Sequence, residues 1–130
     1  KAEAAMALLA AEVPRVTHYL RGCAGFAGFA PGGSGREIAD GFSRAARALL
    51  GDAVWAQWGS EQVMSNVIIA NEGEPVLLPY DRYLNFWNEP VSSEAAFVHF
   101  VGTYRYHGGA YAAAARRAMA WLDCGLSAAA

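Results

Sequence analysis

The chain has 130 residues, which is enough to bury one hydrophobic core but short for most enzymes, so we expect one domain or a piece of a larger one. Hydrophobic residues make up 55% of the chain and charged residues 17%, which excludes a disordered protein. The formal net charge of -2 provides no general attraction to nucleic acid or anionic lipid, and we expect no nucleic-acid partner.

The cysteines and the lack of a targeting pattern bear on location. Cys23 and Cys124 lie far apart without metal-ligand spacing, so we interpret both as thiols in a reducing compartment, with a single disulfide as the alternative. No apolar run approaches the ~20 residues of a membrane span, and the first residues lack the pattern of a secretory signal. We therefore expect a cytoplasmic protein without a transmembrane segment, able to lie peripherally on a membrane. Because the first residue is Lys1 rather than methionine, we expect a processed product or a fragment.

The N-terminal third combines a helix former with a glycine-rich stretch. Residues 1 to 12 are rich in alanine and predict a helical leader that Pro14 must stop. Residues 13 to 20 could be extended. In residues 21 to 30, phenylalanines alternate with glycine and other small residues, which indicates a backbone in close approach to a neighbour. We interpret residues 21 to 30 as a strand that is either buried by packing or turned towards a ligand.

A helix is predicted over residues 36 to 50, where apolar residues recur at helical spacing, and Gly51 ends it. The next segment, residues 57 to 66, is the densest polar cluster of the chain. Ser60 is its predicted N-cap and Glu61 lies in the first turn of a second helix.

Gln62 and Asn66 are four residues apart and therefore share one face of that helix. This polar edge is either part of a site or a cap with side chains that satisfy neighbouring backbone. The sequence alone leaves both interpretations open.

The second half of the chain predicts strands, an aromatic loop and a last helix. Residues 76 to 78 resemble a short buried strand, and residues 80 to 90 an ordered aromatic loop that lines a pocket or seals a core. Residues 95 to 101 predict a strand that carries His99. An alanine-rich helix is predicted over residues 110 to 122, followed by a tail over residues 123 to 130.

Three residues at the end of the His99 strand could carry chemistry together. An imidazole can bind a metal ion, and the glycine at Gly102 lets backbone amides approach phosphate oxygens. Arg105 supplies a planar charged fork that suits phosphate. The pattern indicates a site for a metal-bound diphosphate, and the alternative is a hydrogen-bonded core histidine.

The order of these motifs resembles the C-terminal portion of the GT-A fold glycosyltransferases, especially the retaining family-eight type and related bacterial nucleotide-sugar transferase-like proteins. Cys23-Ala24-Gly25-Phe26 resembles the Asn-Ala/Ser-Gly strand of that family. Glu61-Gln62, with Asn66 further along, resembles its Asp-Gln motif at the start of a helix. His99-x-x-Gly102-x-x-Arg105 resembles its His-x-x-Gly-x-x-Lys segment, which binds the metal and the diphosphate. The resemblance covers residues 19 to 106.

The resemblance implies an α/β fold with a short mixed sheet flanked by helices, and a partial transferase domain over residues 13 to 122. It implies transfer of a sugar from a nucleotide-diphosphate donor to a glycan or other acceptor, with a divalent ion, manganese or magnesium. Gln62 would face the anomeric carbon, Glu61 would bind hydroxyl groups, and His99 would be a metal ligand. The implied substrate-binding residues are Cys23, Ala24, Gly25, Asn66, Gly102 and Arg105.

The departures from that family define the alternative. Cys23 replaces an asparagine that touches the donor sugar, Glu61 replaces aspartate, and Arg105 replaces lysine. No Asp-x-Asp motif occurs, and we expect the nucleotide-binding βαβ units to lie in another half. The alternative is a non-catalytic carbohydrate-binding or interaction domain that retains a transferase-like core. Its sugar contacts would fall to aromatic residues, and its aromatic loop and alanine-rich helices could form a homo-oligomer; those aromatic residues are Tyr80, Tyr83, Phe86 and Trp87.

Overall fold

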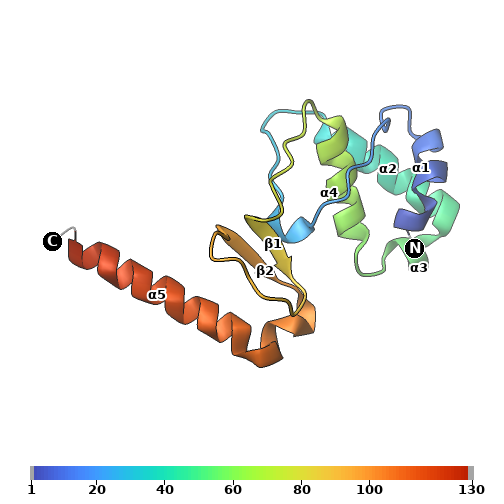
Figure 1. Cartoon of the computed structure of the whole chain (residues 1–130). Coiled ribbons are helices and arrows are strands. Elements are labelled where there is room, and N and C mark those ends of the chain that lie inside the picture. The colour runs from blue at the N-terminus through green and yellow to red at the C-terminus, as the bar shows by residue number, and fades with distance from the viewer. Residues whose placement is uncertain (1, 129–130) are drawn as a thin grey trace. The chain divides into compact units, whose positions relative to one another are not determined.

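The computed structural model describes residues 2 to 128, with side chains described as far as residue 125. The chain forms a small mixed α/β protein whose described elements are helices and a two-stranded sheet (Figure 1). The predicted α/β class is confirmed, whereas the GT-A fold stays a prediction. The chain divides between Leu77 and Leu78 into two compact units, which we call the N-terminal and C-terminal units.

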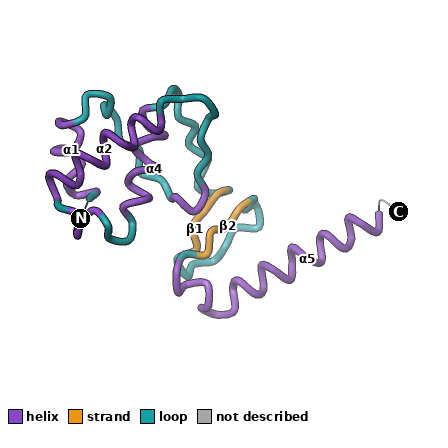
Figure 2. Tube along the Cα trace, turned by 180° about the vertical axis from the view of Figure 1, so that it is seen from behind, coloured by secondary structure: helices purple, strands orange, loops and turns teal. Residues whose placement is uncertain are grey.

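The N-terminal unit is built from helices and loops (Figure 2). A short 3-10 turn, η1, leads into the first helix, so the helix predicted before Pro14 is confirmed over its described residues. Gly51 has a φ of 82° and ends the second helix, as predicted. The helices and 3-10 turns of this unit are η1 (Glu3–Ala5), α1 (Met6–Glu12), η2 (Ala24–Phe26), α2 (Gly35–Leu50), α3 (Asp52–Trp55) and α4 (Ser60–Asn71).

One face of α2 forms the centre of the core. Ile38, Phe42 and Ala46 recur every four residues and are buried, because residues at this spacing share one helix face. The ring of Phe42 meets the ring of Trp55 edge to face, with centroids 5.8 Å apart. The indole Nε1 of Trp55 donates to Oγ of Ser43 at 2.9 Å, so its polar atom is satisfied inside the unit.

The predicted strand over residues 21 to 30 is wrong. This segment contains the 3-10 turn η2 and otherwise no regular structure, and Phe26 and Phe29 are about half exposed. No strand forms over residues 13 to 20 either. The physical reason is that side-chain amides of α4, rather than a neighbouring strand, bind the backbone of residues 17 to 22.

Asn71, the last residue of α4, provides most of these bonds. Its Oδ1 accepts from the backbone N–H of Thr17 at 2.8 Å and of His18 at 3.0 Å. Its Nδ2 donates to the carbonyl oxygens of His18 and Val67, each at 2.8 Å. One side chain therefore satisfies both directions of hydrogen bonding in a segment that has no ladder partner.

The C-terminal unit contains a parallel pair of strands, β1 (Tyr83–Phe86) and β2 (Phe97–Phe100), in which Asn85 lies opposite His99. The chain continues through the 3-10 segment η3 (Gly102–Gly109) into α5 (Ala110–Ala128), which extends away from the strands as one long helix (Figure 1). The Phe100 ring contacts the rings of Phe86 and Tyr111, each at 5.2 Å between centroids. These contacts connect the sheet to the start of α5.

Several boundaries differ from the sequence prediction. The strand over residues 95 to 101 is confirmed as β2, and the aromatic loop over residues 80 to 90 also contains β1. The buried strand over residues 76 to 78 is wrong: these residues are exposed, because Pro75 and Pro79 bracket them and proline cannot donate to a ladder. The last helix continues beyond Leu122 to Ala128, although this stretch contains Gly125, so the predicted tail is helical as far as residue 128. Residues 129 and 130 lie outside the described chain.

Two further expectations concern the membrane and the thiols. None of the helices between residues 2 and 128 combines the length and the apolar character that crossing a bilayer requires. Cys23 and Cys124 are not joined in a disulfide, and Cys124 is exposed on α5.

Candidate functional site

The start of α4 carries the predicted catalytic pair. Gly59, with a φ of 95°, is the N-cap residue, so the prediction that Ser60 caps the helix is wrong. The N-cap glycine has no side chain to bond the first turn, but Oε2 of Glu61, two residues further on, accepts from the Gly59 N–H at 2.9 Å. A carboxylate at this end also interacts favourably with the helix dipole. Glu61 is exposed and Gln62 is half-buried, so both remain near the surface of the unit.

Asn66 lies one turn further along α4 and is buried at 4% exposure. Its Nδ2 donates to the carbonyl oxygen of Gly22 and to the hydroxyl of Tyr19, each at 3.3 Å. A Cβ atom on Gly22 would lie 3.2 Å from Oδ1 of Asn66, which is tight packing. The structure therefore brings Asn66 next to the segment Cys23-Ala24-Gly25, because η2 packs on α4. Its amide satisfies backbone there, as the structural alternative predicts.

The hydroxyl of Tyr19, which accepts from Asn66, has a shifted pKa. Burial raises the pKa of its hydroxyl above the ordinary value of 10.0, the Asn66 bond lowers this pKa, and the negative charge of Glu3 raises it. The hydroxyl donates to Oε1 of Glu3 at 3.1 Å. A raised folded-state pKa means that the neutral form is favoured in the native unit.

This shift predicts a loss of stability at alkaline pH. The contribution of Tyr19 is fully present below its unfolded pKa and is lost as pH rises through the higher folded pKa, since the unfolded state ionises first. The difference in urea midpoint between wild type and Tyr19→Phe should therefore shrink between pH 9 and 11. Urea unfolding at several pH values measures this difference. A difference that stays constant across the range would contradict the assignment.

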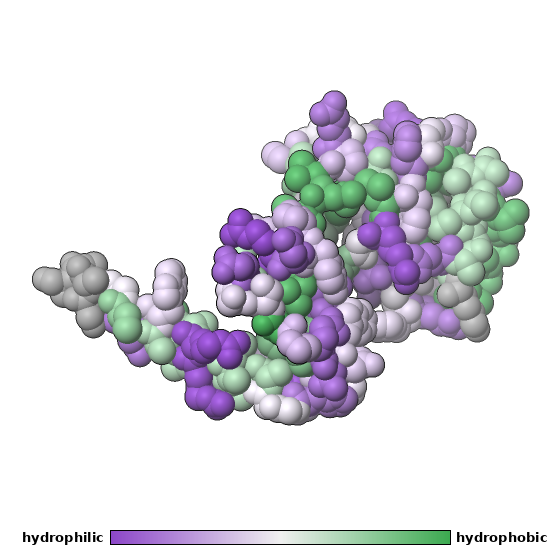
Figure 3. Space-filling model, in the orientation of Figure 1, coloured by the Kyte–Doolittle hydropathy of each residue, from purple (hydrophilic) through white to green (hydrophobic). Residues whose placement is uncertain are grey.

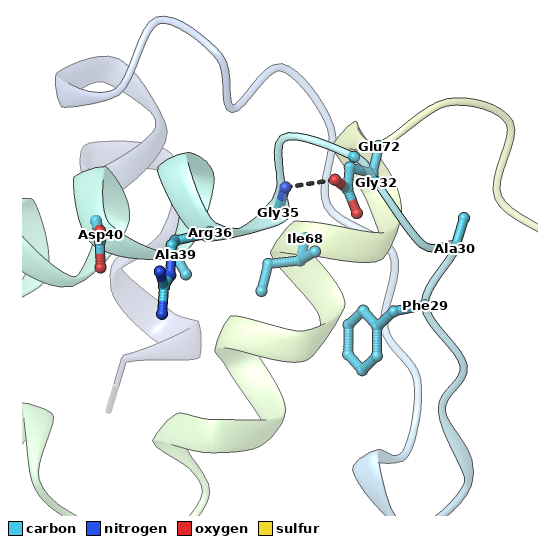
Figure 4. Close-up of a pocket in the computed structure, with 10 residues that line it drawn as sticks. Phe29, Ala30, Gly32, Gly35, Arg36, Ala39, Asp40, Ile68 and Glu72 are labelled. Atoms are coloured by element: carbon cyan, nitrogen blue, oxygen red, sulfur yellow. Dashed lines mark hydrogen bonds between the residues drawn. The ribbon is translucent and has the colours of Figure 1, made fainter.

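A cavity of about 480 Å³ opens between the start of α2 and the end of α4 (Figure 4). The carboxylate of Glu72 accepts a hydrogen bond from the N–H of Gly35 at its edge. Arg36 and Asp40 are exposed on α2, and Figure 4 shows Ile68 and Phe29 on other sides of the same space. No local sequence pattern indicates this cavity, because its walls come from segments that are far apart in the chain. Its lining is Phe29, Ala30, Gly32, Gly33, Gly35, Arg36, Ala39, Asp40, Ile68 and Glu72.

The predicted metal ligand, His99, is half-buried on β2. Its Nδ1 lies 3.1 Å from Oδ1 of Asn85, its register partner on β1. An amide oxygen accepts, so this contact is a hydrogen bond when Nδ1 carries the proton, and Nε2 of the neutral ring then carries the lone pair. A histidine that ligates a metal is commonly oriented by such a second contact, and a core histidine is satisfied by it as well.

Gly102 and Arg105 follow β2 and are linked to each other. Gly102 has a φ of 50°, a left-handed conformation that turns the chain directly after the strand. The Nε of Arg105 donates to the carbonyl oxygen of Gly102 at 2.8 Å, and its guanidinium lies 5.9 Å from the Tyr106 ring centre. The Arg105 side chain is therefore held over the turn, with its positive charge exposed.

The metal-ligand set within the described residues is incomplete. No group of three or more His, Cys, Asp or Glu residues gathers among those that the structure describes. His99 fits the role of one ligand, whereas a divalent ion takes at least four. The other ligands would have to come from bound phosphate, from water or from another protein segment.

The aromatic candidates for sugar contact separate by exposure. Phe86 is buried at 4%, and Tyr83 is half-buried on β1. Trp87 and Tyr80 are exposed. The Trp87 ring meets the Tyr104 ring edge to face at 5.7 Å, which fixes an indole at the surface.

Comparison of the chain with protein-family models, with curated proteins and with solved structures found no match. The fold defines a small mixed α/β protein with two compact units.

Proposed function

We propose that the chain is part of a glycosyltransferase, which transfers a sugar from a nucleotide-diphosphate donor to a glycan or other acceptor. The observation that supports this proposal is the segment after β2, where Gly102 turns the backbone and Arg105 folds back on it, three and six residues after His99. Sites for phosphate groups commonly lie beyond the carboxyl ends of parallel strands. The placement and the charge of this segment support a diphosphate site there.

Each residue of this segment has a separate role in the proposal. The guanidinium of Arg105 neutralises charge that develops on the departing diphosphate, and the turn at Gly102 lets backbone amides approach the phosphate oxygens. Nε2 of His99 would bind the divalent ion, manganese or magnesium, and Asn85 holds the required tautomer. When bound, the ion supplies a Lewis acid for the leaving group.

For the N-terminal unit, taken by itself, the proposal assigns sugar contact to two side chains at the start of α4. Glu61 binds hydroxyl groups, and Gln62 contacts the transferred sugar. Cys23, Ala24 and Gly25 form the surface that contacts the sugar. Asn66 acts as a positioning residue, since its amide already holds the segment through the carbonyl oxygen of Gly22.

Calorimetric titration of the full chain tests the roles of the C-terminal unit. Manganese and uridine diphosphate together should give a heat of binding that His99→Ala abolishes. Arg105→Ala should weaken diphosphate binding by about 10-fold to 100-fold, as expected for loss of a charge-assisted hydrogen bond. Asn85→Ala should lower manganese affinity by about 10-fold or more, since the His99 ring loses the contact that orients it and favours the proton on Nδ1.

The matched control is Arg117→Ala, which removes an exposed arginine from α5 outside the motif. It should leave the binding heats unchanged. Equal heats for wild type, His99→Ala and Arg105→Ala would exclude both roles.

The second candidate is a carbohydrate-binding domain without transfer activity, and the exposed Trp87 indole braced by Tyr104 favours it. The C–H faces of sugar rings pack on exposed aromatic rings of this kind. In the same calorimeter, an oligosaccharide would then bind without metal, and Trp87→Ala rather than His99→Ala would remove the heat. That pattern would replace the transferase assignment.

A further inference from the structure

One exposed face of α5 carries an apolar line. Ala112, Ala115, Met119 and Leu122 follow one another at spacings of three and four residues, which is the seam pattern of two-helix packing. Met119 is 64% exposed and Leu122 is 53% exposed, and both alanines are exposed as well. Figure 3 shows that hydrophobic and hydrophilic residues both lie along this helix.

The C-terminal unit uses a different face of α5 for its own packing. Ala110, Ala113 and Ala114 are the half-buried residues of the helix, and they lie on the side away from Met119. Tyr111 contacts Phe100 at 5.2 Å at the first turn. Beyond this turn, residues 115 to 125 are exposed, so the C-terminal unit leaves the apolar line uncovered.

The charges beside this line select a particular occupant. Arg116 follows Ala115 and Asp123 follows Leu122, so both lie on the same flank of the line, about two turns apart. In an antiparallel pair of identical helices, this flank meets its own copy, and each Arg116 faces the Asp123 of the other helix. In a parallel pair it would meet the opposite flank, where Ala118 and Gly125 offer no charge.

We infer that α5 is the interface of an antiparallel homodimer, with the apolar line at its centre and two symmetric Arg116–Asp123 pairs along one side. A two-fold axis makes one surface serve both copies, as closed dimers require. The alanines of the line let the helix backbones approach closely, at about 8 Å between axes. The inference is independent of the transferase proposal, because no substrate or metal takes part in the contact.

The length of α5 limits how tightly the dimer can form. A helix of 19 residues is about 28 Å long, and its contact falls in the range of small, transient interfaces. We expect a dissociation constant on the order of 10 to 100 µM. Dimer formation would therefore depend on concentration.

Sedimentation equilibrium of the full chain between about 5 and 500 µM tests this inference. Wild type should pass from monomer to dimer over this range. Arg116→Glu and Asp123→Lys, each alone, should weaken dimerisation by about tenfold or more, because each turns two attractive pairs into two repulsive ones. The double variant Arg116→Glu/Asp123→Lys should restore the wild-type constant to within about threefold, since both pairs form again with reversed sign.

The matched control is Arg117→Glu, which makes the same charge change on the side of the helix opposite Met119 and should leave dimerisation unchanged. Met119→Glu should abolish the dimer by placing a charge in the seam. Circular dichroism of each variant confirms that α5 still forms.

Three outcomes would overturn the inference. One is a wild-type chain that stays monomeric at every concentration. Another is a dimer that Arg117→Glu weakens as much as Arg116→Glu, or that the double variant fails to restore. The third is a monomer that instead binds vesicles of phosphatidylserine through α5, which would assign this face to a membrane surface.

Discussion

The Phe42→Ala variant should lose about 3–5 kcal/mol of the free energy of unfolding of the N-terminal unit, as expected for an aromatic residue truncated in a packed core. Phe42 has 0% exposure at the centre of the buried face of α2. Its removal leaves a cavity beside Ile38 and also deprives the Trp55 ring of its edge-to-face partner. A domain of this size has a total stability of about 5–15 kcal/mol, so the variant should be close to unfolding.

Amide hydrogen exchange under native conditions measures this loss separately for each unit. The amides of α2 and α4 should exchange faster in Phe42→Ala, because their protection depends on the free energy of opening. The control is Trp58→Ala, which truncates a larger ring at 92% exposure and should change stability by less than about 0.5 kcal/mol. Equal effects of the two substitutions would show that Phe42 does not occupy the core position described here.

The second large effect concerns a polar residue. Asn71→Ala should destabilise the N-terminal unit by about 2–4 kcal/mol, since each hydrogen bond contributes about 1 kcal/mol net and the released backbone groups lose their partners. The backbone groups released are the N–H of Thr17 and the N–H and carbonyl of His18. Hydrogen exchange at Thr17 and His18 should lose its protection, and urea unfolding should give the loss of free energy.

Asn71→Asp separates the two halves of this contact. The carboxylate keeps an acceptor for the N–H groups of Thr17 and His18, but it loses both donors and meets the carbonyl oxygens of His18 and Val67. Its stability should therefore lie between wild type and Asn71→Ala. Ser65→Ala is the control, because Ser65 Oγ donates only to the Glu61 carbonyl within α4. An Asn71→Ala loss no larger than that of Ser65→Ala would contradict the prediction.

The sequence predicts those parts of the fold that local spacing determines. The helix over residues 36 to 50 was predictable because its apolar residues recur at 3.6-residue spacing and Gly51 ends it. The segment from residue 13 to residue 30 was not, because its backbone between residues 17 and 22 is bound by two asparagine side chains of α4, more than 40 residues away. The alternation of phenylalanine with glycine in residues 21 to 30 resembles the pattern of a strand. A strand forms only where a neighbouring strand accepts and donates its backbone hydrogen bonds.

In the candidate site, too, local features were predictable from the sequence and tertiary contacts were not. His99, Gly102 and Arg105 could be found from sequence, because they lie on one short segment. The contact between His99 and Asn85 depends on the parallel register of β1 and β2, which no local pattern encodes. The cavity edged by Gly35 and Glu72 was missed for the same reason, since its two walls are joined only by tertiary packing.

The two-stranded sheet of the C-terminal unit could be extended by a further strand. Among the described residues, β1 and β2 each have one ladder neighbour, so each strand presents its other edge to whatever lies beside it. Two-stranded sheets are marginal in isolation and gain stability from a third strand. A strand that paired with the outer edge of β2 would align its own side chains with His99. The residue types on such an added strand would then determine whether His99 gains further metal ligands or only a tighter polar contact.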